Sequence, residues 1–200
     1  MNRRLFKIFI LALLFLPAAV NAQLKYTSVN YMISMPLGDT KDYIEDASFR
    51  SFGFETGQFV NDNIAVGIGL GWLVFNENVT GELIQSGNTT LAGKQFRYIN
   101  SFPIYASANY YFSEEDDRVK FYAGAGVGTM YKIQRTEIGV IAFEDTQWHF
   151  ALYPHAGVLF AMGPDAHINL DFKYNQAFAA GDSDAVSFLS INLGLHYIFF

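Results

Sequence analysis

Eight stretches of the chain alternate apolar and polar residues with a period of two. The clearest runs from residue 64 to residue 74, where Ile, Val, Leu and Trp alternate with Ala and Gly. Such alternation predicts a β-strand with one apolar and one polar face. A helix is disfavoured because glycine recurs at every second position. The pattern predicts strands over 24–36, 49–60, 64–75, 96–112, 119–133, 147–161, 167–178 and 186–200.

The connections between these strands alternate between short and long. Those after the second, fourth and sixth strands are short, whereas those after the first, third and fifth cover 37–48, 76–95 and 134–146. Short turns at one end and long loops at the other are typical of an outer-membrane barrel, with the turns in the periplasm. Because the strand number is even, we expect both termini on the periplasmic side.

The chemistry of the two strand faces indicates which solvent surrounds them. One face carries branched and aromatic residues almost without charge, as contact with lipid requires. The other face combines glycines, which suit a narrow interior, with charged residues that we expect to pair as an interior polar network. This predicts an all-β fold, a closed eight-stranded antiparallel up-and-down transmembrane β-barrel without a wide channel; a soluble barrel with a polar cavity is the alternative. The charged residues of the interior face are Glu55, Arg97, Lys120, Lys132, Asp171 and Lys173.

Aromatic residues gather at the strand ends of this topology. Trp72, Tyr131, Trp148 and Tyr174 fall at the ends that lead into the long loops. Amphipathic rings favour membrane–water interfaces. We therefore expect these four residues to form an aromatic girdle on the extracellular side.

The first 22 residues have the form of a secretory signal peptide. Arg3, Arg4 and Lys7 precede an apolar stretch, and the chain then reaches a small-residue cleavage site at Ala22. We expect residues 23–200 to form one barrel domain. Removing the three basic residues leaves 10 of 13 against 19 acidic ones, a net charge of −9. This acidity argues against nucleic-acid binding, and the lack of cysteine excludes disulfides and thiolate metal sites.

The mature chain resembles the small eight-stranded outer-membrane proteins of the OmpA, OmpX and OmpW type. The most similar segments are Gly53–Gly71, Phe102–Phe112 and Gly194–Phe200. The resemblance implies a Gram-negative cell outer membrane and an assembly signal read by the barrel-assembly machinery, comprising Tyr197, Phe199 and Phe200. Counting back by two from Phe199 gives Tyr197, Leu195, Leu193 and Ile191, so we expect Phe200 to be one extra residue that points inward or lies at the rim.

Candidate chemistry is sparse. All four histidines fall at strand positions that are predicted to face the interior: His149, His155, His167 and His196. Barrel-fold lipid A deacylases carry a serine two residues from their histidine, and no histidine here has one. His149 and His155 are also about 20 Å apart along one strand, too far to share a metal. We expect no catalytic residue, no metal site and no cofactor.

Three functional hypotheses remain. The first is a non-enzymatic outer-membrane protein that supports envelope integrity or surface interaction through its loops. The second is a narrow barrel that carries small hydrophobic molecules across the membrane, as proposed for OmpW-like proteins. The third is a lipid-modifying enzyme built on His149 or His155.

The expected partners are outer-membrane lipid, lipopolysaccharide and the assembly machinery, and the expected state is a monomer. Acidic residues in the long loops suggest solvated loops or, alternatively, cation bridges to lipopolysaccharide.

Overall fold

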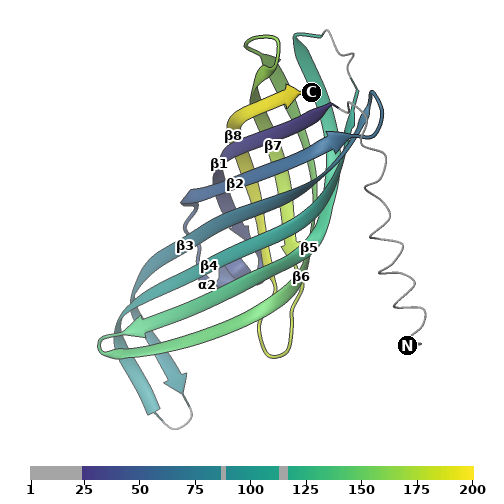
Figure 1. Ribbon diagram of the computed structural model, residues 1–200. Helices are drawn as coiled ribbons and strands as arrows, with labels where there is room; N and C mark the ends of the chain where they lie inside the picture. The colour runs from purple at the N-terminus through teal and green to yellow at the C-terminus, as the bar shows by residue number, and fades with distance from the viewer. Residues whose placement is uncertain (1–23, 87–88, 113–116) are drawn as a thin grey trace, which may run out of the picture.

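The computed structural model describes residues 24–86, 89–112 and 117–200, and shows a closed barrel in which β8 pairs with β1 (Figure 1). Every neighbouring pair of strands is antiparallel and follows chain order, which confirms the predicted fold. The predicted signal peptide lies outside the described residues. The strands are β1 (Lys25–Leu37), β2 (Ser48–Phe59), β3 (Ile64–Ser86), β4 (Thr89–Tyr111), β5 (Val119–Ile138), β6 (Ile141–Ala161), β7 (Ala166–Ala177) and β8 (Val186–Phe199).

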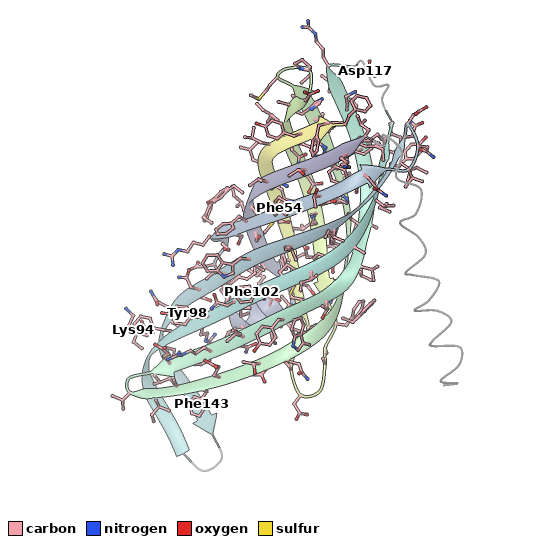
Figure 2. All side chains as sticks on the ribbon, in the orientation of Figure 1. Phe54, Lys94, Tyr98, Phe102, Asp117 and Phe143 are labelled. Carbon is pink, nitrogen blue, oxygen red and sulfur yellow. The ribbon has the colours of Figure 1, made fainter. Side chains whose placement is uncertain are left out.

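The apolar face of the strands points outward. In β3, Ile68 and Leu70 expose 60% and 52% of their surface, while Gly67, Gly69 and Gly71 line the interior. Side chains project from both faces of the barrel wall (Figure 2). In the described part of the chain, no helix has the length and apolarity needed to cross a bilayer.

Two of the predicted long loops are mostly strand. β3 and β4 continue through the predicted loop 76–95, and β5 and β6 continue through 134–146 to a turn at Gly139 and Val140. Gly139 takes a positive φ of 61° there. The sequence pattern missed these extensions because the apolar alternation fades there, while the backbone pairing continues.

The two ends of the barrel differ accordingly. We call the end with the two long hairpins and residues 178–185 the loop end, and the opposite end, with Leu24 and Phe200, the turn end. At the loop end the β3–β4 and β5–β6 hairpins extend past the other strands (Figure 1). The first connection holds a short helix that the sequence pattern did not predict, α2 (Gly38–Tyr43).

The interior is filled in three layers. An apolar layer lies toward the loop end and an aromatic layer toward the turn end, with hydrogen-bonded polar residues between them. The loop-end layer was not expected, because the sequence pattern assigned the interior to polar residues and glycines. It contains Ile44, Leu73, Phe75, Ile99, Tyr105, Met130, Ala151, Tyr153, Ala177, Val186 and Phe188.

Candidate functional site in the lumen and at the loop end

A buried carboxylate on β2 is the first centre of the middle layer. Glu55 accepts hydrogen bonds at Oε1 from the hydroxyls of Tyr26 (2.8 Å) and Ser107 (2.7 Å) and from Nδ2 of Asn109 (3.2 Å). These partners come from β1 and β4, so the carboxylate is held from two strands. Hydrogen bonds to an ionised acceptor are among the strong ones.

A second carboxylate on β7 is linked to the first through a histidine. Asp171 lies 2.7 Å from Nδ1 of His155 and accepts a hydrogen bond from Nδ2 of Asn192 at 2.6 Å. The other ring nitrogen of His155 lies 2.8 Å from Oδ1 of Asn109, whose Nδ2 binds Glu55. One polar cluster therefore joins six strands across the lumen.

The six charged residues predicted for the interior lie at three levels rather than in one network. Glu55, Asp171 and Lys173 share the middle layer, with the Lys173 ammonium 4.0 Å from the ring centre of Tyr153. Arg97 and Lys132 lie toward the loop end, and Lys120 lies near the turn end. The six residues do not meet in one place, because Lys120 and Lys132 are 12 positions apart on β5, about 40 Å along a strand.

Two small cavities flank Lys173. Their volumes are about 20 and 40 Å³, and both are lined by Asn30, Glu55 and Lys173. A water molecule needs about 10–15 Å³ of such space. Each cavity thus has room for one to a few water molecules, and neither could hold a larger hydrophobic molecule.

All four histidines are buried. Nδ1 of His149 lies 2.8 Å from the carbonyl oxygen of Phe178, and His155 belongs to the polar cluster. Within the described residues no three His, Cys, Asp or Glu side chains come together as a metal site. The His155–Asp171 pair was missed in the sequence, where the only available signal was the shared interior parity of both residues on neighbouring predicted strands.

The loop end is closed by α2 and the residue after it. Thr40 accepts a hydrogen bond from the backbone N–H of Ser187 (2.9 Å), and Arg97 donates to the carbonyl oxygen of Tyr43 (3.1 Å). Ile44 is fully buried in the apolar layer. The Tyr43 hydroxyl contacts Thr136 on β5, and burial raises the pKa of this phenol. The first loop is thereby tied to three strands and seals the lumen.

The long hairpins form a sheet with an open edge. β6 pairs with β7 only from Ala151 onward, so its first ten residues lack a strand on that side. The carbonyl oxygen of Phe150 faces this side, since it accepts a hydrogen bond from the N–H of Phe178. Because the pattern alternates, the backbone groups of Ala142, Glu144 and Thr146 face the same free edge.

The exposed side chains of the loop end are predominantly acidic. Eight exposed acidic residues stand against four exposed basic ones, Lys41, Arg50, Lys94 and Arg135, among the described residues. The apolar Val140 at the tip of the β5–β6 hairpin is fully exposed. The acidic residues are Asp39, Asp42, Glu45, Asp46, Glu144, Asp145, Asp182 and Asp184.

The four predicted girdle residues lie on the outer surface. Trp72 packs against Phe52 with ring centres 5.2 Å apart, and Tyr131 packs against Trp148 at 4.9 Å. Tyr174 exposes 37% of its surface. The sequence pattern placed Trp72, Tyr131 and Trp148 at strand ends. They lie within their strands instead, because β3, β5 and β6 continue beyond them.

The last strand places its aromatic residues differently. Tyr197 and Phe199 expose 45% and 40% of their surfaces, while Phe200 follows the end of β8 and is 83% exposed. Phe199 pairs with Lys25 of β1, so it belongs to the seam that closes the barrel. Phe200 lies at the rim of the turn end.

Known structures share this architecture. One is Ail, the attachment invasion locus protein of Yersinia pestis, in complex with the heparin analogue sucrose octasulfate. It has 14% identity to this chain and a TM-score of 0.52, and the match covers 88% of this chain and 99% of Ail. Neisserial surface protein A has 17% identity and a TM-score of 0.52, with coverages of 88% and 96%. OprG from Pseudomonas aeruginosa has 15% identity and a TM-score of 0.50, with coverages of 89% and 96%.

The family of this chain follows from a match to a family model. No curated protein matches the chain. The family model of the outer membrane protein beta-barrel domain, however, matches residues 8–199. With the closed barrel and its apolar outer surface, this places the protein in the cell outer membrane. The chain belongs to the outer membrane protein beta-barrel domain family.

Proposed function

We propose that this barrel is a non-enzymatic outer-membrane protein whose loop end faces the exterior and mediates surface interaction or supports the envelope. The observation that carries the proposal is the sheet that projects beyond the girdle residues. Its edge at Ala142, Glu144 and Thr146 and its apolar tip at Val140 are open to a partner. Unpaired edges are otherwise covered or blunted in proteins.

The filled lumen supports a role at the surface rather than transport. The apolar layer and α2 obstruct the loop end, and the aromatic layer obstructs the turn end. The cavities between them are too small for the hydrophobic cargo of the carrier hypothesis. His149 and His155 point into this lumen and not toward lipid, which speaks against a lipid-modifying enzyme.

The charge of the loop end bears on the partner. The excess of exposed acidic residues favours basic partners or divalent cations that bridge to lipopolysaccharide. Binding of a polysulfate, as shown for Ail in its complex with sucrose octasulfate, is not supported here. We further propose a monomer that contacts outer-membrane lipid and is inserted by the barrel-assembly machinery.

The orientation is tested first. Because the chain has no cysteine, Val140→Cys and Asp62→Cys each introduce a single exposed thiol, one at each end of the barrel. A membrane-impermeant maleimide should label Val140→Cys on intact cells and Asp62→Cys only after lysis. The opposite labelling would place the loop end in the periplasm and refute the proposal.

The role of the projecting sheet is tested by shortening it. Replacing Glu137–Ala142 with Asn-Gly keeps the pairing of Thr136 with Phe143 and needs only a two-residue turn. A deletion strain is complemented with the intact or the shortened protein, and cell adherence and dye permeability are measured. A surface role predicts that the shortened protein inserts normally but does not restore adherence. An envelope role predicts that both proteins return dye entry to the low level of the wild-type strain. If neither readout differs between the deletion strain and the complemented strain, the proposal fails.

A further inference from the structure

Five tyrosines are buried in the lumen and form a nearly continuous series of ring contacts. Tyr105 and Tyr153 have ring centres 4.6 Å apart, and Tyr111 and Tyr122 have ring centres 5.4 Å apart. His155 bridges the two pairs, at 5.3 Å from Tyr153 and 5.6 Å from Tyr122. Phe59 continues the series from Tyr111 (5.0 Å) to Tyr26 (6.3 Å).

Packing accounts for the rings of these residues but not for their hydroxyl groups. Tyr26 fills the space opposite Gly57 and Gly67, and Tyr153 fills the space opposite Gly126, where a Cβ would collide with the ring. Phenylalanine would fill the same space. The phenolic oxygens therefore require a separate explanation.

The hydroxyl of Tyr26 is placed against a proton acceptor. It donates to Glu55 Oε1 at 2.8 Å, within the buried cluster. Tyr122 donates to the amide oxygen of Asn169 at 2.7 Å and lies 3.3 Å from Asp171 Oδ2. An amide oxygen cannot retain a proton, whereas a carboxylate can. Oxidation of a phenol is easiest where its proton has a close acceptor that can retain it. The hydrogen bond from Tyr26 to the Glu55 carboxylate (2.8 Å) is shorter than the one from Tyr122 to the Asp171 carboxylate (3.3 Å), so Tyr26 is the favoured site.

We propose that the buried tyrosines trap one-electron oxidants, with Tyr26 as the final radical site. The oxidant class is a lipid peroxyl radical formed in the surrounding bilayer. The phenol of Tyr26 loses one electron, its O–H bond breaks and the proton moves to Glu55. The products are a neutral phenoxyl radical, a protonated Glu55 and a lipid peroxide anion. At the membrane surface this anion takes a proton from water, which gives a lipid hydroperoxide and a hydroxide ion.

The other tyrosines carry the electron vacancy toward Tyr26. Rings in van der Waals contact allow short electron-transfer steps, and Tyr122 with Tyr111 connects the β5–β6 side of the lumen to the Phe59–Tyr26 side. Lys173, whose ammonium lies over the Tyr153 ring, disfavours a positive charge there. The vacancy is thereby directed away from Tyr153.

The proposal is tested with a photosensitiser attached at one site. Ala125→Cys introduces a single thiol on the outer face of β5, to which a ruthenium tris-bipyridine complex is coupled before refolding into nanodiscs. A flash with persulfate as quencher generates the one-electron oxidant. Electron paramagnetic resonance and transient absorption should detect a phenoxyl radical, and Tyr26→Phe should shorten its lifetime at least tenfold.

Two further variants distinguish trapping from packing. Glu55→Gln should shorten the lifetime like Tyr26→Phe, because the proton acceptor is lost, whereas Tyr131→Phe on the lipid face should leave it unchanged. If Glu55→Gln does not fold, as judged by migration in cold SDS gels, Tyr26→Phe alone decides, since it keeps the ring. Equal lifetimes in wild type and Tyr26→Phe would overturn the proposal.

A separate measurement tests the oxidant class. In nanodiscs of polyunsaturated phosphatidylcholine with an azo initiator, the wild type should slow hydroperoxide formation relative to Tyr26→Phe. Equal rates would rule out the lipid peroxyl radical as the oxidant.

Discussion

At the scale of single residues, the glycines of the inner wall serve different purposes. A Cβ at Gly128 would collide with the backbone carbonyl of Ile104 on β4, which cannot move aside without disturbing the strand pair. A Cβ at Gly69 would meet only the Phe54 carbonyl oxygen at 3.7 Å and Glu55 Cγ at 3.8 Å, beside a cavity. Glycine is thus required by contact at the first position and leaves open space at the second.

This difference predicts unequal effects of the same substitution. Gly128→Ala should lower the free energy of unfolding by about 1–3 kcal/mol, the usual cost of overpacking. Gly69→Ala should change it by less than about 0.5 kcal/mol or stabilise the barrel, because alanine restricts the unfolded chain. Urea titration of the protein in lipid vesicles measures both. Equal losses would show that the cavity beside Gly69 is not available.

Phe199 and Phe200 provide a second comparison between neighbours. Phe199 pairs across the closing seam and faces lipid, whereas Phe200 lies beyond the strand. Phe199→Ser should reduce the heat-modifiable, membrane-inserted fraction strongly and cost about 1.5–3 kcal/mol of folding free energy. Phe200→Ser should have a much smaller effect on both measurements. A larger loss at Phe200 would show that the assembly signal is counted from the last residue.

Parity in the sequence predicted which side of the wall a residue faces, but not its partners. It placed His155 and Asp171 on the interior, yet the pair also requires the register between β6 and β7, which a period-two pattern leaves undetermined. Likewise Arg97 and Lys120 both occupy interior-facing positions of their strands but lie at opposite ends of the lumen. Height in the barrel follows from strand tilt and stagger, and the sequence pattern contains neither.

At the scale of elements, strand existence was predictable where lipid enforces alternation, and strand length was not. β1, β2, β7 and β8 end within about two residues of their predicted bounds, whereas β3 to β6 extend well beyond theirs. The extensions are held by backbone pairing and a tight turn at Gly139. The loops that remain are held by specific contacts, of which Lys132 makes one.

Lys132 fixes the last loop to the barrel wall. Its ammonium donates to the carbonyl oxygen of Asp184 at 3.0 Å and to Oε1 of Gln134 at 3.1 Å while the side chain is 1% exposed. Hydrogen bonds to a charged group are worth about 1.5–3 kcal/mol. Lys132→Met should therefore accelerate hydrogen–deuterium exchange in residues 180–185 at least about tenfold.

The control for this prediction is a lysine outside the lumen. Lys94→Met, at an exposed site on β4, should leave exchange in residues 180–185 unchanged. If both variants exchange like the wild type, the loop is held by other contacts, such as the hydrogen bond from Ser183 to Asp145. The strand pairing of β7 with β8 should remain protected in either variant.

At the scale of the whole molecule, the barrel is sealed twice, and this governs ion passage. Phe188 and Tyr105 are part of the apolar layer, and Phe59 and Tyr111 are part of the aromatic layer beyond the polar cluster. An ion entering the lumen would have to shed its water in an apolar layer, which is costly without compensating partners. Each end of the lumen therefore holds a layer of buried apolar or aromatic side chains.

The wild-type protein should consequently show no large, stepwise single-channel conductance in planar bilayers. Removing one seal should not suffice, because the other remains: Phe188→Ala with Tyr105→Ala, or Phe59→Ala with Tyr111→Ala, should each stay near the wild-type current. Combining all four substitutions should produce a small cation leak, since Glu55 and Asp171 would then line an open path. A large conductance of the wild type would show that α2 and the apolar layer move as a gate, and a transport function would have to replace the surface role proposed above.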